Sequence, residues 1–220
     1  MDAARRTKLL VFGLAGVLLL AVAGSMLYGV KKKRDLETSA LTSSADATAR
    51  LLEAASGKAD AARLQEHAQA VAQHLETLRR EDLSRSKALA ETAELYLTDA
   101  HAILRNQAAA ARARAAATAS RRALAAHIAN AGERGAGWIQ QALALKSRAE
   151  RDNFDFRTAQ GALATLYHAH RESQDKLRAV APSVPLIEES QRQSLRQQAQ
   201  DAEKQAEAEI ERIRTMALPR

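Results

Sequence analysis

The sequence has no cysteine and few of the residues that interrupt helices or favour strands. The absence of cysteine excludes disulfides, thiolate nucleophiles and cysteine-based metal sites. Aromatic residues make up 3% of the 220 residues, and there are three prolines and nine glycines. Strands prefer β-branched and aromatic residues, whereas Ala, Leu, Arg, Glu and Gln favour helices. The composition therefore predicts an all-α protein, and its many alanines predict a slender bundle, because each alanine buries little apolar area.

The net charge of +7 is concentrated near the N-terminus. Seven of the 33 basic residues and one of the 26 acidic residues lie in 1–34, which leaves 35–220 almost neutral, with 26 basic and 25 acidic side chains. Basic residues commonly flank membrane spans, so this distribution argues against a nucleic-acid protein. The predicted membrane-flanking residues are Arg5, Arg6, Lys8, Lys31, Lys32, Lys33 and Arg34.

An uncharged apolar segment of 22 residues runs from Leu9 to Val30. As a helix it would span about 33 Å, which matches the hydrocarbon thickness of a bilayer. A cleaved signal peptide is the alternative, because Ala21 to Ala23 offers small residues at a suitable spacing. The apolar run continues past Ala23 without a polar region, which favours an uncleaved transmembrane anchor at 9–30.

The charges on the two sides of this segment barely distinguish its orientation. Three basic residues lie in the short tail at 1–8 and four in the linker at 31–35. The linker alone would hold the rest of the chain in the cytoplasm. A short basic N-terminal tail usually stays inside while the chain beyond the span is exported, so we expect an inner-membrane, single-pass protein with a periplasmic body.

The body at 36–216 has few breaks. Residues 130–137 (NAGERGAG) are the clearest turn, residues 182–185 (PSVP) form the second, and Gly57 is a lesser break. Residues 81–84 (EDLS) offer helix-capping side chains. These breaks predict helices at about 36–80, 83–130, 138–181 and 186–216.

Apolar residues in these segments recur at alternating steps of four and three, which predicts helices that pack along heptad seams. The seam of the third segment covers about 40 residues and consists of Trp138, Ala142, Leu145, Ala149, Asp152, Phe156, Ala159, Leu163, Leu166, His170, Ser173 and Leu177. The predicted seam of the second segment consists of Leu97, His101, Leu104, Ala108, Ala111, Ala115, Thr118, Arg122 and Ala125. The first segment restarts its seam near Gly57 with Leu64, Ala68, Val71, Leu75 and Leu78.

The segment lengths predict how the helices are connected. The second and third segments flank a short glycine turn, so they should form an antiparallel hairpin of matched lengths. Adding the other two segments gives an up-down-up-down arrangement, a coiled-coil-like bundle of four helices beyond the anchor. The rival is one continuous helix through Glu81, which would make a rod with a hairpin at its far end.

The sequence contains no catalytic, metal or cofactor motif, so we expect neither an enzyme nor a cofactor. The six histidines lack the spacing of helical metal sites, although His101 and His170 fall on seams and suggest a pH-responsive pair. Residues 132–137 contain three glycines, but no strand precedes them and no Lys-Ser/Thr ending comes after them, so they predict a plain turn.

Residues 100–132 contain no acidic residue but five arginines. In one interpretation these arginines form ion pairs with acidic residues of the first and last segments. In the other they form a partner-binding surface, to which Trp138 beside the turn would add an aromatic anchor. The possible partner-binding residues are Arg105, Arg112, Arg114, Arg121, Arg122 and Trp138.

Long seams without site chemistry favour a non-catalytic scaffold or adaptor in a bacterial cell envelope. We expect membrane lipid as one partner, and a second copy or another envelope protein as the other. Nucleic acid is not expected, because no aromatic residues are interleaved with the arginines. The alternatives are an extracytoplasmic small-ligand sensor that signals through a partner protein, and a cytoplasmic membrane-tethered coiled coil. The sequence identifies no small molecule.

Overall fold

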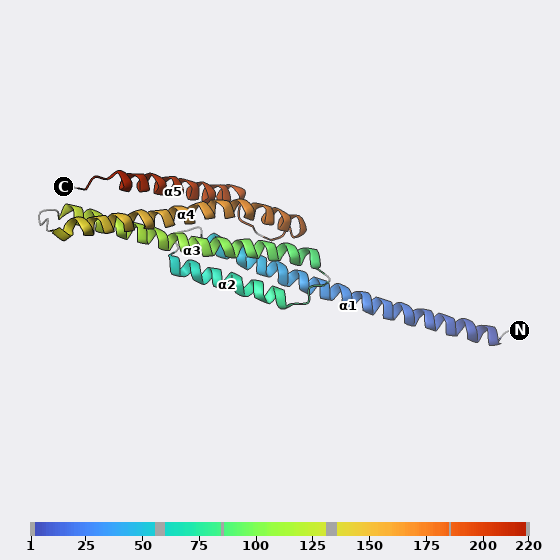
Figure 1. Cartoon of the computed structure of the whole chain (residues 1–220). Coiled ribbons are helices and arrows are strands. Elements are labelled where there is room, and N and C mark those ends of the chain that lie inside the picture. The colour runs from blue at the N-terminus through green and yellow to red at the C-terminus, as the bar shows by residue number, and fades with distance from the viewer. Residues whose placement is uncertain (1–2, 56–59, 85, 131–135, 185, 219–220) are drawn as a thin grey trace.

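The computed structural model describes residues 3–55, 60–84, 86–130, 136–184 and 186–218, and it describes side chains from Tyr28 onward, except that of Ala136. All regular structure in these residues is helical, and the helices pack in an elongated bundle (Figure 1). The predicted all-α class is therefore confirmed. The five helices are α1 (Ala3–Ala55), α2 (Ala61–Arg80), α3 (Lys87–Ala129), α4 (Ala136–Val180) and α5 (Glu189–Thr215).

Helices α3 and α4 form the predicted antiparallel hairpin and are the spine of the molecule (Figure 1). The predicted seam of α4 is confirmed, since each of its twelve residues is buried or half-buried. Large side chains such as Leu163 and Leu177 mark this face unambiguously and are 5% and 1% exposed. The hairpin buries this seam because α4 has α3 beside it along its whole length.

The expected single helix at 36–80 is wrong, because the chain reverses between α1 and α2. Helix α1 ends at Ala55 and α2 begins at Ala61, where the carboxylate of Asp60 accepts a 2.8 Å hydrogen bond from the Arg63 backbone N–H. This cap stabilises a new helix start. The seam predicted after the break is confirmed, since Leu64, Ala68, Val71, Leu75 and Leu78 are all buried. Gly57 itself lies outside the described residues.

The rival of one continuous helix through Glu81 is also wrong. Helix α2 ends at Arg80, Glu81 has an extended backbone, and α3 starts at Lys87. Helices α2 and α3 pack side by side as a second antiparallel hairpin (Figure 1). The chain therefore makes turns where residues 81–84 suggested a junction.

The bundle differs from four helices of matched length. Helices α1 and α2 lie on α3, whereas the backbone of α5 runs closest to that of α4. The large core combines α1 and α2 with the nearer parts of the spine. Among the described helices, only α3, α4 and α5 extend into the half where α3 ends and α4 begins (Figure 1). We call this the distal half, and it contains a small core cluster of Leu124, Ala149 and Ile213.

The predicted seam of the second segment is wrong in its distal half. Leu97, Leu104 and Ala108 are buried, but Ala115 and Ala125 are exposed. One buried row there recurs every seven positions instead, as Ile103, Ala110, Ala117 and Leu124, and Ser120 is buried beside it. Alanines fill nearly every position between 108 and 119, so their pattern does not distinguish one helix face from another. The packing of α4 and α5 decides which alanines are covered.

Helix α1 continues as a single helix well beyond the bundle (Figure 1). Residues 28–36 are exposed, and the helix first becomes buried at Glu37 and Leu41. Most of the predicted anchor at 9–30 lies outside the residues whose side chains are described, and so does the tail at 1–8. Within the described part, no helix is both long and apolar enough to cross a bilayer.

We expect Leu97→Ala to destabilise the protein by about 2–5 kcal/mol, because Leu97 is fully buried in the spine and its truncation leaves a cavity. Leu95→Ala is the matched control on the same helix, since Leu95 is 40% exposed and should change stability by no more than about 0.5 kcal/mol. Urea unfolding followed by circular dichroism measures both. Equal losses in the two variants would contradict the packing of α3.

Candidate functional site

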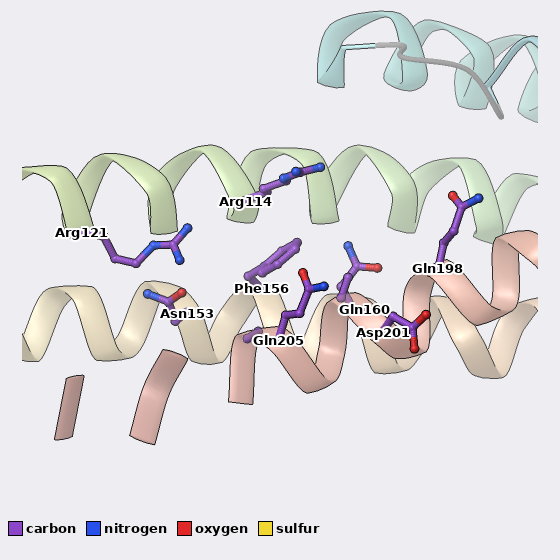
Figure 2. Close-up of a pocket in the computed structure, with 10 residues that line it drawn as sticks. Arg114, Arg121, Asn153, Phe156, Gln160, Gln198, Asp201 and Gln205 are labelled. Carbon is purple, nitrogen blue, oxygen red and sulfur yellow. The ribbon is translucent and has the colours of Figure 1, made fainter. Parts of the chain in front are cut away.

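The five arginines of α3 divide into two groups. Arg114 and Arg121 line a groove of about 390 Å³ between α3, α4 and α5, and Figure 2 shows both side chains beside it. Arg105, Arg112 and Arg122 do not line it. The sequence therefore singled out two residues that line this groove, but it did not separate them from the other three arginines.

The groove lies between α3 and α5, because the backbones of both helices approach α4 closely but do not approach each other. Its floor comes from α4, which supplies Asn153, Phe156 and Gln160. Asn153 is only 1% exposed, and its Nδ2 atom donates a 2.7 Å hydrogen bond to the Ala149 carbonyl. The wall formed by α5 is polar and consists of Gln198, Asp201 and Gln205, together with two alanines.

The two walls of the groove carry opposite charge. The α3 wall belongs to the stretch without acidic residues, whereas α5 supplies Asp201, and Glu209 about two turns further on. Arg121 and Glu209 form an ion pair of 3.7 Å across the helices. The expected interhelical ion pairs of the arginine stretch are therefore found at Arg121, and Arg114 makes none with the described residues.

Trp138 lies at the start of α4, beside the α3–α4 turn. It is 7% exposed, and its ring stacks on His127 with centroids 5.0 Å apart and an interplanar angle of 15°. The Nε2 atom of His127 lies 3.0 Å from the Trp138 carbonyl oxygen. The indole thus closes the end of the hairpin and is not part of an open surface.

A second polar cluster is buried near the start of α5. His170 of α4 is 1% exposed and packs against the fully buried Tyr96 of α3, with ring centroids 5.0 Å apart. Gln174 donates to the Ile187 carbonyl and accepts a 3.0 Å hydrogen bond from Nη1 of Arg192, which also pairs with the carboxylate at 189. The predicted partner of His170 was His101, but the structure places Tyr96 there.

Burial dominates the electrostatics of this cluster. It lowers the pKa of His170 to about 4, and the positive charge of Arg192 contributes to the same shift. Burial also raises the pKa of Tyr96, with a smaller contribution from Asp46. Burial lowers the pKa of Arg192. Neither ring nitrogen of His170 has a hydrogen-bond partner among the described residues. The histidine is therefore neutral at pH 7.

Sequence reasoning missed Tyr96, Gln174 and Arg192 as members of a buried cluster. Tyr96 lies seven positions before Ile103, in the buried row of α3 that the predicted seam did not include. Nothing in the sequence signals the burial of Arg192, because it depends on how the turn between α4 and α5 returns the chain to the spine. Within the described part of the chain, no group of three or more histidine and acidic side chains could hold a metal ion.

The membrane-flanking residues on the body side lie on the exposed part of α1. Residues 31–34 are all exposed, and Nζ of Lys33 forms a 2.8 Å hydrogen-bonded ion pair with Asp82 in the α2–α3 turn. The hydrogen bond from Lys33, followed by those from Ser84, lowers the pKa of Asp82 to about 2. The predicted flanking residues Arg5, Arg6 and Lys8 lie outside the residues whose side chains are described.

Comparison with known proteins assigns the chain to no family. No family model matches it, and neither do curated proteins or solved structures.

We expect His170 to make the fold sensitive to acid. Its pKa is about 4 when folded and about 6.5 when unfolded, so between these values the unfolded chain binds more protons and stability falls as the pH falls. His170→Phe should remove about 3 kcal/mol of the loss measured between pH 7 and pH 4.

Urea unfolding at several pH values measures this effect, and His168→Phe is the control, because His168 is exposed two residues away. Protonation of the carboxylates should lower the stability of the wild-type protein and of both variants by the same amount. If His170→Phe and the wild-type protein lost stability in parallel from pH 7 to pH 4, the buried neutral histidine would be disproved.

Proposed function

We propose that the protein is a non-catalytic scaffold or adaptor, a helical bundle held at a membrane by its N-terminal segment. The observation that carries the proposal is the continuity of α1, a single helix from Ala3 to Ala55. Its first part contains the apolar segment 9–30, and its last part contributes Leu41, Ala45 and Leu52 to the large core. An anchor and a bundle that share one helix would move as a unit.

The stretch between the two parts supports this arrangement. Residues 28–36 are exposed, so no other described helix covers them. They include four consecutive basic residues at 31–34, the type of residue that lies beside lipid headgroups. The pair between Lys33 and Asp82 brings the α2–α3 turn to this basic stretch and would brace the bundle where it approaches the membrane.

The length of the spine supports a spacer role. The 43 residues of α3 make a rod about 65 Å long. The last residues of α3 and the first residues of α4 lie at the end of the bundle away from the N-terminus (Figure 1). An envelope protein or a second copy bound near that end would be held well away from the membrane. We place the protein in the inner membrane as a single-pass protein with a periplasmic body.

One observation favours a second candidate function, the sensing of a small ligand. The groove beside Arg114 and Arg121 is large enough for a small molecule and is lined by side chains that converge on it from three helices (Figure 2). A sensor without catalytic groups would pass its signal to a partner protein. The scaffold and sensor functions share the same anchor and differ in what the bundle binds.

The membrane anchor and its orientation can be tested together. We expect the full-length protein to sediment with membranes and to require detergent for release. A C-terminal alkaline phosphatase fusion should be active, and a C-terminal fluorescent protein that folds only in the cytoplasm should be dark. Leu19→Arg with Leu20→Arg is the control, because two charges in the apolar segment should abolish insertion.

Recovery of the wild-type protein in the soluble fraction without detergent would contradict the anchor. The reverse reporter pattern would contradict the periplasmic body and support the cytoplasmic alternative. The scaffold role fails if photo-crosslinkers at the exposed Arg122, near the distal end, yield neither dimer nor adduct in intact cells.

A further inference from the structure

The groove between α3 and α5 has a positive wall, a negative wall and unfilled hydrogen-bonding capacity between them. We propose that it binds a small zwitterion, a free amino acid or a short peptide, with its carboxylate on Arg114 and its ammonium on Asp201. This inference does not depend on the membrane anchor or on the scaffold function, because every group that it uses belongs to α3, α4 or α5.

Arg114 and Asp201 face the groove from different helices but are not paired with each other. The Arg114 side chain makes no ion pair with the described residues, and Asp201 accepts a single 2.9 Å hydrogen bond, from Gln197 of its own helix. Arg121 is different, since Glu209 partly neutralises it. A carboxylate would therefore gain most at Arg114, where charge-assisted bonds to a guanidinium are strong.

Four amide side chains line the same groove as these two charges. Gln160 and Gln205 make no side-chain hydrogen bond with the described residues, and Gln198 donates only to Ser194 at 3.2 Å. Asn153 uses its Nδ2 atom within α4, which leaves its Oδ1 atom without a described partner. Amides both donate and accept, so this lining matches the donors and acceptors of an amino acid or a peptide bond.

The residues that line the groove favour a small polar ligand over a fourth helix as its occupant. A partner helix would need a row of apolar residues to pack against, as in the seam between α3 and α4. Phe156 is the one aromatic residue in the groove, and it is surrounded by charged and amide groups (Figure 2). The volume of about 390 Å³ lies in the range of small-molecule sites. The ring would contact the ligand's own side chain.

Isothermal titration calorimetry on the full-length protein in detergent tests the proposal. The probes are each common L-amino acid and L-alanyl-L-alanine, and they separate a free amino acid from a short peptide. For each probe that binds, its N-acetylated form keeps only the carboxylate and its amide form keeps only the ammonium. We expect one or more zwitterions to bind and both modified forms to bind about tenfold more weakly or not at all.

Matched variants locate the site. Arg114→Gln and Asp201→Asn should each weaken binding of the zwitterion about tenfold, because each removes one charged contact. The controls are Arg112→Gln, which neutralises an arginine of the same helix outside the groove, and Asp155→Asn, which neutralises an exposed acid of α4. Circular dichroism at equal helix content excludes misfolding as the cause of a loss.

Three results would overturn the proposal. The first is that no amino acid and no dipeptide binds. The second is that the acetylated or amide forms bind as well as the zwitterion, which would show that one wall is not used. The third is that the control variants lose as much affinity as Arg114→Gln and Asp201→Asn, which would place the binding outside the groove. None of these results bears on the anchor, which is tested separately by the reporter fusions.

Discussion

The packing of α3 against α4 is the interaction on which the rest of the structure depends. Both are long helices joined by a short turn, and each buries a seam against the other along its whole length. The seam is strong where it contains Leu163, Leu177 and Ile103 and weak where alanines predominate, because alanine buries little apolar area. Helices α1, α2 and α5 are stabilised by packing against α3 and α4.

The unequal lengths of the covering helices explain both polar features of the molecule. Helix α1 ends at Ala55, so α5 is the one other described helix beside α3 and α4 in their distal half. Three helices cannot enclose a core as four do, and a polar groove remains between α3 and α5. Near the start of α5, by contrast, His170 and Arg192 are both buried. Arg192 contacts Gln174 and Glu189, whereas the ring nitrogens of His170 have no hydrogen-bond partner among the described residues.

The sequence predicts this structure well where large apolar residues mark one face of a helix, and poorly where they do not. The seams of α2 and α4 follow from leucine, valine and aromatic positions, but the distal seam of α3 is ambiguous because most residues from 108 to 119 are alanine or arginine. The reversal before Ala61 is hard to predict because a single glycine marks it. In the groove, Arg114 and Arg121 stand out by charge, whereas Asp201 and the amides come together only through the antiparallel return of α5.

Intramolecular crosslinking tests the central claim most directly, because the chain has no cysteine of its own. Cysteine pairs replace residues whose side chains are in contact between helices: Gln107→Cys with Tyr167→Cys joins α3 to α4, Arg79→Cys with Glu94→Cys joins α2 to α3, and Glu150→Cys with Arg214→Cys joins α4 to α5. A short bismaleimide should link all three pairs within one chain, because the two residues of each pair lie side by side. Failure of any pair to link, or links that form only between two chains, would contradict a spine of α3 packed on α4 and covered by α2 and α5.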